Sequence, residues 1–173
     1  RFAIVRNGRA GPQRTMNPSL PPALKARTDA LLEGVSRKDL AGRAAAISRA
    51  YRTGEGSAAT ITDEASVIAY VLARMPATYA VADAVFHAIK EAAPEFAPKR
   101  RLDVGTGPGT TSWAAFEAWS CLQTIAMTDS NTEFLRIGKH LAEQHRTLAA
   151  AAIVTRDLRD AAFPLPNAEL VTA

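Results

Sequence analysis

Three glycines spaced by two stand in the segment Arg-Leu-Asp-Val-Gly-Thr-Gly-Pro-Gly at residues 101–109, and this segment predicts a cofactor loop. Glycine is needed where a chain turns with positive φ, or where its backbone approaches a ligand too closely for a Cβ. The N–H groups at the start of a following helix then face a polar or anionic ligand. We therefore expect a strand–loop–helix unit that holds a nucleotide-like cofactor. The predicted loop residues are Gly105, Thr106, Gly107 and Gly109.

The spacing of these glycines favours S-adenosylmethionine over NAD. In the dinucleotide pattern Gly-x-Gly-x-x-Gly the third glycine would fall on Thr110, whereas this chain has it at Gly109. Asp103, two residues before the first glycine, is expected on the ligand side of the strand end. A carboxylate there would repel a pyrophosphate and accept a hydrogen bond from a cationic amino group. A nicotinamide oxidoreductase remains the disfavoured alternative.

A second acidic residue follows the next apolar run, 122–128, at a distance that suits a cofactor. Asp129 comes twenty residues after Gly109 and ends this predicted strand. An acidic residue in that place accepts hydrogen bonds from ribose hydroxyls. Ser130 is counted with the same site, and either Ser130 or Asn131 is expected to cap the next helix.

A third acidic residue follows the apolar run 151–155. Asp157 is expected to accept from the adenine amino group, with Leu158 against the ring. A solvated turn aspartate is the open alternative for Asp157. No residue is identified as a catalytic base.

The elements that position these residues follow from hydrophobic period and turn signals. Three short apolar runs alternate with helical stretches at 110–119 and 133–144, which predicts parallel strands. Residues 169–173 read as the opening of a fourth strand. Upstream, helices are expected over about 22–32, 37–52, 62–75 and 76–93, with Thr62 as the cap of the third and Pro76 starting or kinking the fourth.

The charge is uneven along the chain. Residues 1–52 contain eleven Arg or Lys and three Asp or Glu, whereas residues 53–173 contain ten and fourteen. A basic amino-terminal third indicates contact with a polyanion, and a solvated basic face is the alternative. The candidate RNA-binding residues are Arg37, Lys38, Arg43, Arg49 and Arg52.

Composition excludes several other classes. Cys121 is the only cysteine, so neither an intramolecular disulfide framework nor an all-cysteine metal site is possible within the chain. The three histidines lack metal-binding spacing. No apolar run approaches the roughly eighteen residues that span a bilayer, so no membrane partner is expected. Trp113 and Trp119 are read as core residues of the first α/β helix.

Together, these residues resemble a known family. Leu-Asp-Val-Gly-Thr-Gly-Pro-Gly with Asp129 and Asp157 resembles the cofactor half of a class I S-adenosylmethionine-dependent methyltransferase. Three upstream segments narrow the resemblance to the methyltransferase-like family of mitochondrial ribosomal small-subunit proteins and their bacterial relatives: 21–24, 43–51 and 70–79. The resemblance runs from about Asn17 to the end of the chain.

The resemblance implies an α/β fold, with an amino-terminal helical region followed by a partial (truncated) class I methyltransferase Rossmann-like sheet. Residues 1–15 are expected to be a disordered basic leader or non-native extension, 16–98 a helical RNA-facing region, and 99–173 an S-adenosylmethionine-binding half-domain that is incomplete at its carboxyl end.

The implied function is that of an S-adenosylmethionine-dependent methyltransferase fragment acting on small-subunit ribosomal RNA. The alternative is a non-catalytic small-subunit assembly factor that retains the fold. The expected partners are ribosomal RNA or the small ribosomal subunit, without a metal. The cytoplasm is the expected location, with the mitochondrial matrix as the alternative.

Overall fold

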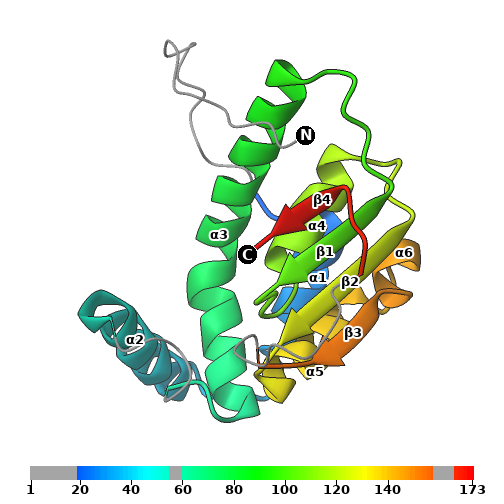
Figure 1. The fold of residues 1–173 in the computed structure, drawn as a ribbon. Helices are drawn as coiled ribbons and strands as arrows, with labels where there is room; N and C mark the ends of the chain where they lie inside the picture. Colours follow the sequence, from blue (N-terminus) through cyan, green and yellow to red (C-terminus); the bar gives the residue numbers. More distant parts are fainter. Residues whose placement is uncertain (1–18, 55–59, 158–165) are drawn as a thin grey trace.

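Four parallel strands form one sheet in the order β3-β2-β1-β4 (Figure 1). The computed structural model describes residues 19–54, 60–157 and 166–173, so the predictions for residues 1–15 and for Leu158 lie outside the described residues. The strands are β1 (Arg100–Val104), β2 (Thr124–Asp129), β3 (Ala152–Thr155) and β4 (Leu170–Thr172). This order is the one found in Rossmann-like sheets. The predicted α/β fold with a partial Rossmann-like sheet is confirmed.

The strand register brings the predicted site residues to one edge of the sheet. Val104 at the end of β1 pairs with Thr128, and Asp129 at the end of β2 pairs with Thr155 of β3. The carboxyl ends of parallel strands therefore meet where the glycine loop begins.

Three helices connect or follow the strands: α4 (Thr110–Ala118), α5 (Thr132–Ala142) and α6 (Arg146–Ala149). The Asn131 side chain accepts a hydrogen bond from the Phe134 N–H at 3.1 Å, so Asn131 is the cap of α5. The short helix α6 was not predicted. Its four residues are too few to show a helical period.

The amino-terminal part consists of α1 (Pro22–Ala30), α2 (Arg37–Thr53) and α3 (Glu64–Ala92). Ser36 caps α2, because its side chain accepts a hydrogen bond from the Asp39 N–H at 3.4 Å. The prediction of Thr62 as the cap of α3 is wrong, because the carboxylate of Asp63 accepts from the Ser66 N–H at 2.8 Å.

Helix α3 runs through Pro76 without a break, so the predicted boundary between Met75 and Pro76 is wrong. A proline inside a helix removes one backbone hydrogen bond and strains the preceding turn. Met75 and Tyr79, on either side of Pro76, are both buried, at 0% and 4% exposure. Burial of one continuous face therefore outweighs the cost of the proline.

The core is continuous between the helical part and the sheet. Helix α3 runs along α4, and buried side chains from both helices belong to one cluster (Figure 1). Trp113 and Trp119 are 3% and 4% exposed, which confirms that they are core residues. Phe86 of α3 lies 5.2 Å from Trp119 between ring centres.

Among the described residues, α3 is also the helix that is long and apolar enough to cross a membrane. The core helix of a soluble protein has the same length and composition. Val67, Val71 and Met75 of α3 are at most 1% exposed because they pack inside the molecule. A membrane assignment does not follow from this helix.

His145 couples the stability of the fold to pH. Its Nδ1 accepts the Leu148 N–H at 3.2 Å, and its ring packs against Trp113 and Phe116. Burial lowers the pKa of His145 below its ordinary value, although the charge of Glu117 opposes the shift. The folded state therefore favours the neutral ring, which is the form that can cap α6.

We expect the free energy of unfolding to be largest above the unfolded-state pKa of about 6.5 and to fall as the pH drops below it, because the unfolded chain binds the proton more readily. Denaturant unfolding at pH 7.5 and pH 5.5 measures this loss. The His145→Asn variant retains a capping side chain and should lose less between the two pH values. Equal losses in both proteins would show that His145 is not the source of the effect.

Candidate cofactor site

The loop between β1 and α4 has the backbone shape that its glycines predict. Gly105, Gly107 and Gly109 have φ angles of +64°, +54° and +82°. Residues with a Cβ seldom adopt this left-handed region, so the three glycines set the path of the loop.

The three glycines face different surroundings. A Cβ added at Gly109 would lie 2.8 Å from the Met127 Cε, so this glycine allows the loop to pack on β2. A Cβ added at Gly105 or Gly107 would have no atom within 4 Å. The backbone at these two positions therefore borders open space, as a loop that holds a ligand requires.

Helix α5 supports the loop from its other side. A Cβ at Gly138 would lie 3.1 Å from the Pro108 carbonyl carbon, so the helix approaches the loop backbone closely because residue 138 lacks a side chain. Inside the loop, the Thr106 N–H donates to the Thr128 carbonyl and the Gly109 N–H to the Thr106 carbonyl, both at 3.0 Å.

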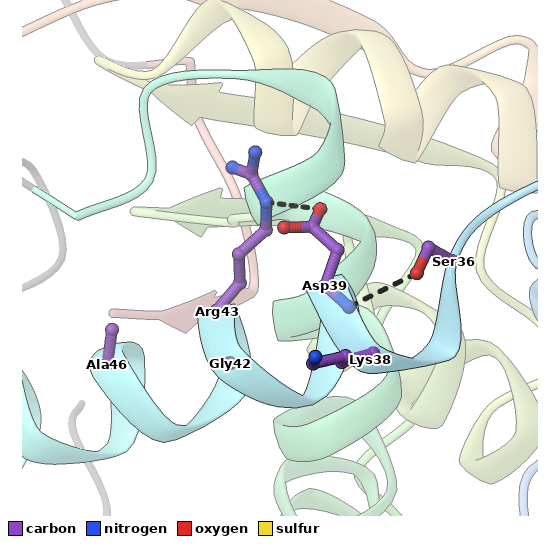
Figure 2. A pocket seen from close by; sticks show the side chains of 6 residues that line it. All are labelled: Ser36, Lys38, Asp39, Gly42, Arg43 and Ala46. Atoms are coloured by element: carbon purple, nitrogen blue, oxygen red, sulfur yellow. Dashed lines mark hydrogen bonds and ion pairs between the residues drawn. The ribbon is translucent and has the colours of Figure 1, made fainter.

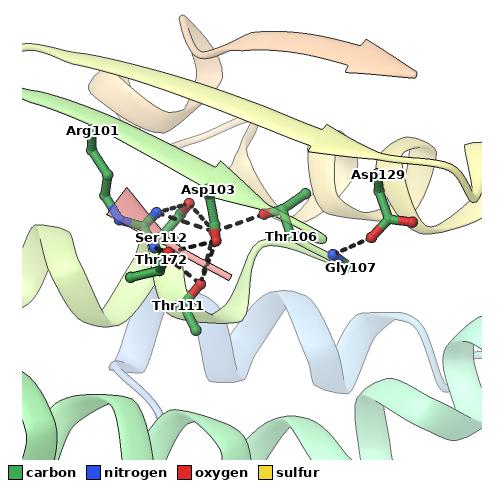
Figure 3. A network of polar contacts seen from close by, with 8 residues as sticks. All are labelled: Arg101, Asp103, Thr106, Gly107, Thr111, Ser112, Asp129 and Thr172. Carbon is green, nitrogen blue, oxygen red and sulfur yellow. Dashed lines mark hydrogen bonds and ion pairs between the residues drawn. The ribbon is translucent and has the colours of Figure 1, made fainter. Parts of the chain in front are cut away.

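Asp129 lies beside the loop, as predicted from its position after β2. Its Oδ2 accepts from the Gly107 N–H at 2.7 Å and its Oδ1 from the Asn131 N–H at 2.9 Å (Figure 3). A carboxylate offers about four acceptor positions. Because each oxygen of the half-buried Asp129 has one of these protein donors, the group retains capacity for two ribose hydroxyls.

The remaining predicted residues lie along the same edge. Ser130 is exposed next to Asp129, and Asp157 is half-buried after the end of β3. The Arg156 N–H donates to the Asp129 carbonyl at 2.7 Å, which brings the chain after β3 to this edge. Leu158 lies outside the described residues.

The segment before α3 also reaches this edge. The Asn131 side-chain amide donates to the Ile61 carbonyl at 2.7 Å. The start of α3 is thereby fixed next to the glycine loop, although Asn131 was predicted only as a possible helix cap.

Asp103 differs from the expectation that it faces a ligand. It is 2% exposed, and its carboxylate lies beneath the loop among hydroxyl groups and the guanidinium of Arg101 (Figure 3). Burial alone would raise the pKa of Asp103, but the Arg101 charge and the hydroxyl donors bring it below the ordinary value. The group is therefore ionised and bound by the protein.

The predicted RNA-binding residues lie on α2 in two different settings. Arg43 donates to Asp39 at 2.8 Å, to Asp63 at 2.9 Å and to Ser66 at 2.8 Å, so its guanidinium holds α2 against the start of α3. Figure 2 shows Arg43 and Asp39 in a shallow hollow formed by Ser36 and α2. The other four candidates are exposed: Arg37, Lys38, Arg49 and Arg52.

Sequence reasoning missed the polar residues beneath the loop. Arg101 stands two residues before Asp103 on one strand, so both side chains lie on the same face. Thr111 and Ser112 begin α4, and Thr172 comes from β4. Two signals in the sequence could have shown these residues: the alternation of side chains along β1, and the hydroxyl residues at the start of α4.

No group of three or more His, Cys, Asp or Glu side chains able to hold a metal ion occurs in the part of the chain that the structure describes. Cys121 is half-buried, and its Sγ lies 3.4 Å from the Pro98 carbonyl.

The parallel order of the sheet, the glycine loop after β1 and Asp129 after β2 define a Rossmann-like α/β fold. The family described as mitochondrial small ribosomal subunit Rsm22 matches residues 64–173, and the chain belongs to this family. The predicted family resemblance is confirmed. The match begins at α3, so the predicted motif segments 21–24 and 43–51 lie outside it.

A human relative is the mitochondrial ribosome assembly protein METTL17, which is 34% identical over 75 residues. The alignment covers 43% of this chain and 16% of METTL17, so it spans a small part of that protein. Among solved structures, the plantazolicin methyltransferase BpumL, in complex with a monoazolic desmethylPZN analog and SAH, has a TM-score of 0.46 at 14% identity. The superposition covers 86% of this chain and 49% of BpumL.

Proposed function

We propose that this chain is the cofactor-binding part of an S-adenosylmethionine-dependent methyltransferase that acts on small-subunit ribosomal RNA. The observation that carries the proposal is the open backbone at Gly105 and Gly107, next to an Asp129 carboxylate with free acceptor capacity. A nucleoside with an amino acid end has the hydroxyl and amino groups that such an edge can bind.

Different residues at this edge of the sheet would bind different parts of the cofactor. In this proposal, the loop Gly105–Gly107 lies against the amino acid end, Asp129 accepts the ribose hydroxyls, and Asp157 accepts the adenine amino group. The sulfonium of the bound cofactor supplies the methyl group, and the protein orients it against its acceptor.

The exposed basic side chains of α2 support an RNA partner. Helix α2 projects from the side of the molecule toward which the carboxyl ends of the strands point (Figure 1). RNA phosphates bound along α2 would therefore lie on the same side as the glycine loop. The family description and the name of METTL17 both refer to mitochondria, which favours the mitochondrial matrix over the cytoplasm.

Calorimetry with S-adenosylmethionine tests the cofactor site, after circular dichroism has shown folded protein. We expect binding by the wild-type chain and a loss of about 1–3 kcal/mol of binding free energy in Asp129→Ala, because polar groups lose their partner. Asp29→Ala, which removes an exposed carboxylate from α1, is the matched control. Binding of NAD in preference to S-adenosylmethionine would instead support the oxidoreductase.

RNA affinity measured at several salt concentrations tests the role of α2. We expect Arg49→Ala and Arg52→Ala to weaken binding to a small-subunit RNA fragment and to lower the salt slope by about 0.7 for each lost phosphate contact to a single strand. Lys25→Ala removes an equally exposed charge from α1, where Lys25 pairs with Asp29, and should change little. Unchanged salt slopes in the α2 variants would indicate that α2 is a solvated basic face that does not contact RNA phosphates.

The second candidate is an assembly factor that keeps the fold without transferring a methyl group. The human relative METTL17 is named as a ribosome assembly protein, which favours this candidate. Methyl incorporation into small-subunit RNA by a full-length protein separates the candidates. Incorporation at a defined nucleotide would exclude the assembly factor, whereas RNA binding without incorporation would support it.

A further inference from the structure

The strand β1 carries a buried ion pair directly beneath the glycine loop. The side chains of Arg101 and Asp103 are 0% and 3% exposed, and the Arg101 Nη1 lies 3.1 Å from the Asp103 Oδ2. A pair this deep is costly unless further hydrogen bonds satisfy both groups. Three neighbouring elements supply these bonds, except at the Arg101 Nε, which is buried without a partner among the described residues.

Hydroxyl groups connect the two charges. Those of Thr111, Ser112 and Thr172 each accept a hydrogen bond from Arg101 and donate one to Asp103. Their donations to Asp103 are 2.7–2.9 Å long. Each hydroxyl is oriented by this double role, so α4 and β4 are tied to β1 at one point (Figure 3).

The carboxylate of Asp103 has no capacity left for a ligand. It accepts from Arg101, from the three bridging hydroxyls and from the Thr106 hydroxyl at 2.8 Å. These five donors fill the roughly four acceptor positions of a carboxylate. A cofactor amino group would have to displace one of them from a buried site.

Thr106 connects the carboxylate of Asp103 to the glycine loop. Its hydroxyl is bound by Asp103, while its backbone N–H and carbonyl bind Thr128 and Gly109. Its neighbours are Gly105 and Gly107, the two positions that border open space. The position of Asp103 therefore fixes the part of the backbone that would meet a ligand.

We propose that the Arg101–Asp103 pair is a positioning device for the glycine loop. It fixes the loop from inside through Thr106, and it makes the shape of the loop depend on β4 through Thr172. Asp103 acts on a bound ligand only through the loop. The part that concerns a ligand rests on the proposed function, whereas the part that concerns loop shape does not.

Hydrogen exchange in the ligand-free chain tests the link to β4. In Thr172→Val, the amides of Thr106, Gly107 and Gly109 should exchange about two- to tenfold faster relative to the amides of α5, the factor that corresponds to one hydrogen bond. Thr155→Val, on the opposite edge strand, is the matched control and should leave the ratio unchanged. An unchanged ratio in Thr172→Val would overturn the proposal.

A ligand comparison separates positioning from direct contact. S-adenosylhomocysteine has the amino acid end, and 5′-methylthioadenosine lacks it. Because the loop lies against the amino acid end in the proposed function, S-adenosylhomocysteine reports the shape of the loop and 5′-methylthioadenosine is the control. Positioning predicts that Thr106→Val, which removes the hydroxyl that joins the loop to Asp103, weakens S-adenosylhomocysteine by the same factor as Asp103→Asn. A loss in Asp103→Asn without one in Thr106→Val would overturn it. If the wild-type chain binds neither nucleoside, the proposed function fails. In that case, or if Asp103→Asn does not fold, the exchange ratio of Thr172→Val decides alone.

Discussion

Replacing Asp103 by alanine is expected to lower the free energy of unfolding by about 3–5 kcal/mol, the usual cost of leaving one charge of a buried pair without its partner. The Arg101 guanidinium would remain in the core at 1% exposure, and the bridging hydroxyls would lose their common acceptor. A domain has a total stability of about 5–15 kcal/mol, so this loss would be a large part of it. Denaturant unfolding at pH 7 measures it.

The double variant Arg101→Met, Asp103→Leu is the control for this effect. Apolar residues of similar size often replace a buried ion pair at little cost, so the double variant should lose less stability than Asp103→Ala alone. An equal or larger loss in the double variant would show that the hydroxyl network, and not the unpaired charge, dominates.

The contribution of Asp103 to the free energy of unfolding is expected to decrease in acid. The pKa of Asp103 is below its ordinary value in the folded chain, despite the opposing effect of burial. Its contribution is therefore present above the unfolded pKa of about 3.9 and is lost as the pH falls through the folded value. The difference between wild type and Asp103→Ala should shrink in acid.

The fold was predictable because its signals are local. Short apolar runs, the glycine loop and a capping asparagine each depend on residues close in sequence, and the structure places a strand, a turn and a helix there. Pro76 misled the prediction because the proline signal is also local. Burial of Met75 and Tyr79, which holds α3 together, depends on elements distant in sequence.

The site was predictable only where it depends on the path of the backbone. The glycines and Asp129 were found from spacing, since register fixes where strand ends meet. Asp103 was assigned a ligand-facing direction because the local signals do not show that its partners enclose the carboxylate. One of these partners, Thr172, stands 69 residues away.

Arg43 shows the same limit on the surface. Arg43 was predicted as an RNA-binding residue, but Asp63 lies twenty residues further along the chain and accepts a hydrogen bond from it. Hydrogen bonds to Asp39 and Asp63 raise the pKa of Arg43 above its ordinary value. A helical wheel of α2 alone cannot show a carboxylate that belongs to the start of α3.

Replacing Trp119 by alanine is expected to cost about 3–5 kcal/mol, as for large aromatic residues in a core. Trp119 packs between Phe86 of α3 and Phe96, at 5.2 and 5.8 Å between ring centres, and its Nε1 donates to the Phe96 carbonyl at 3.1 Å. Trp119→Phe keeps a ring but loses this hydrogen bond, so its loss should be much smaller. Val85→Ala changes an exposed residue of α3, at 49% exposure, and should stay within about 0.5 kcal/mol.

The unfolding transition of Trp119→Ala tests whether residues 16–98 and 99–173 are separate domains. Since the buried cluster that crosses this boundary also contains residues such as Met75 of α3 and Trp113 of α4, both parts should still unfold together in this variant. Far-ultraviolet circular dichroism, which reports the helices, and the fluorescence of Trp113, which reports the α/β part, should then show the same midpoint. If the helices persist after the Trp113 signal is lost, the helical region is an independent domain, and Trp119 joins two folding units.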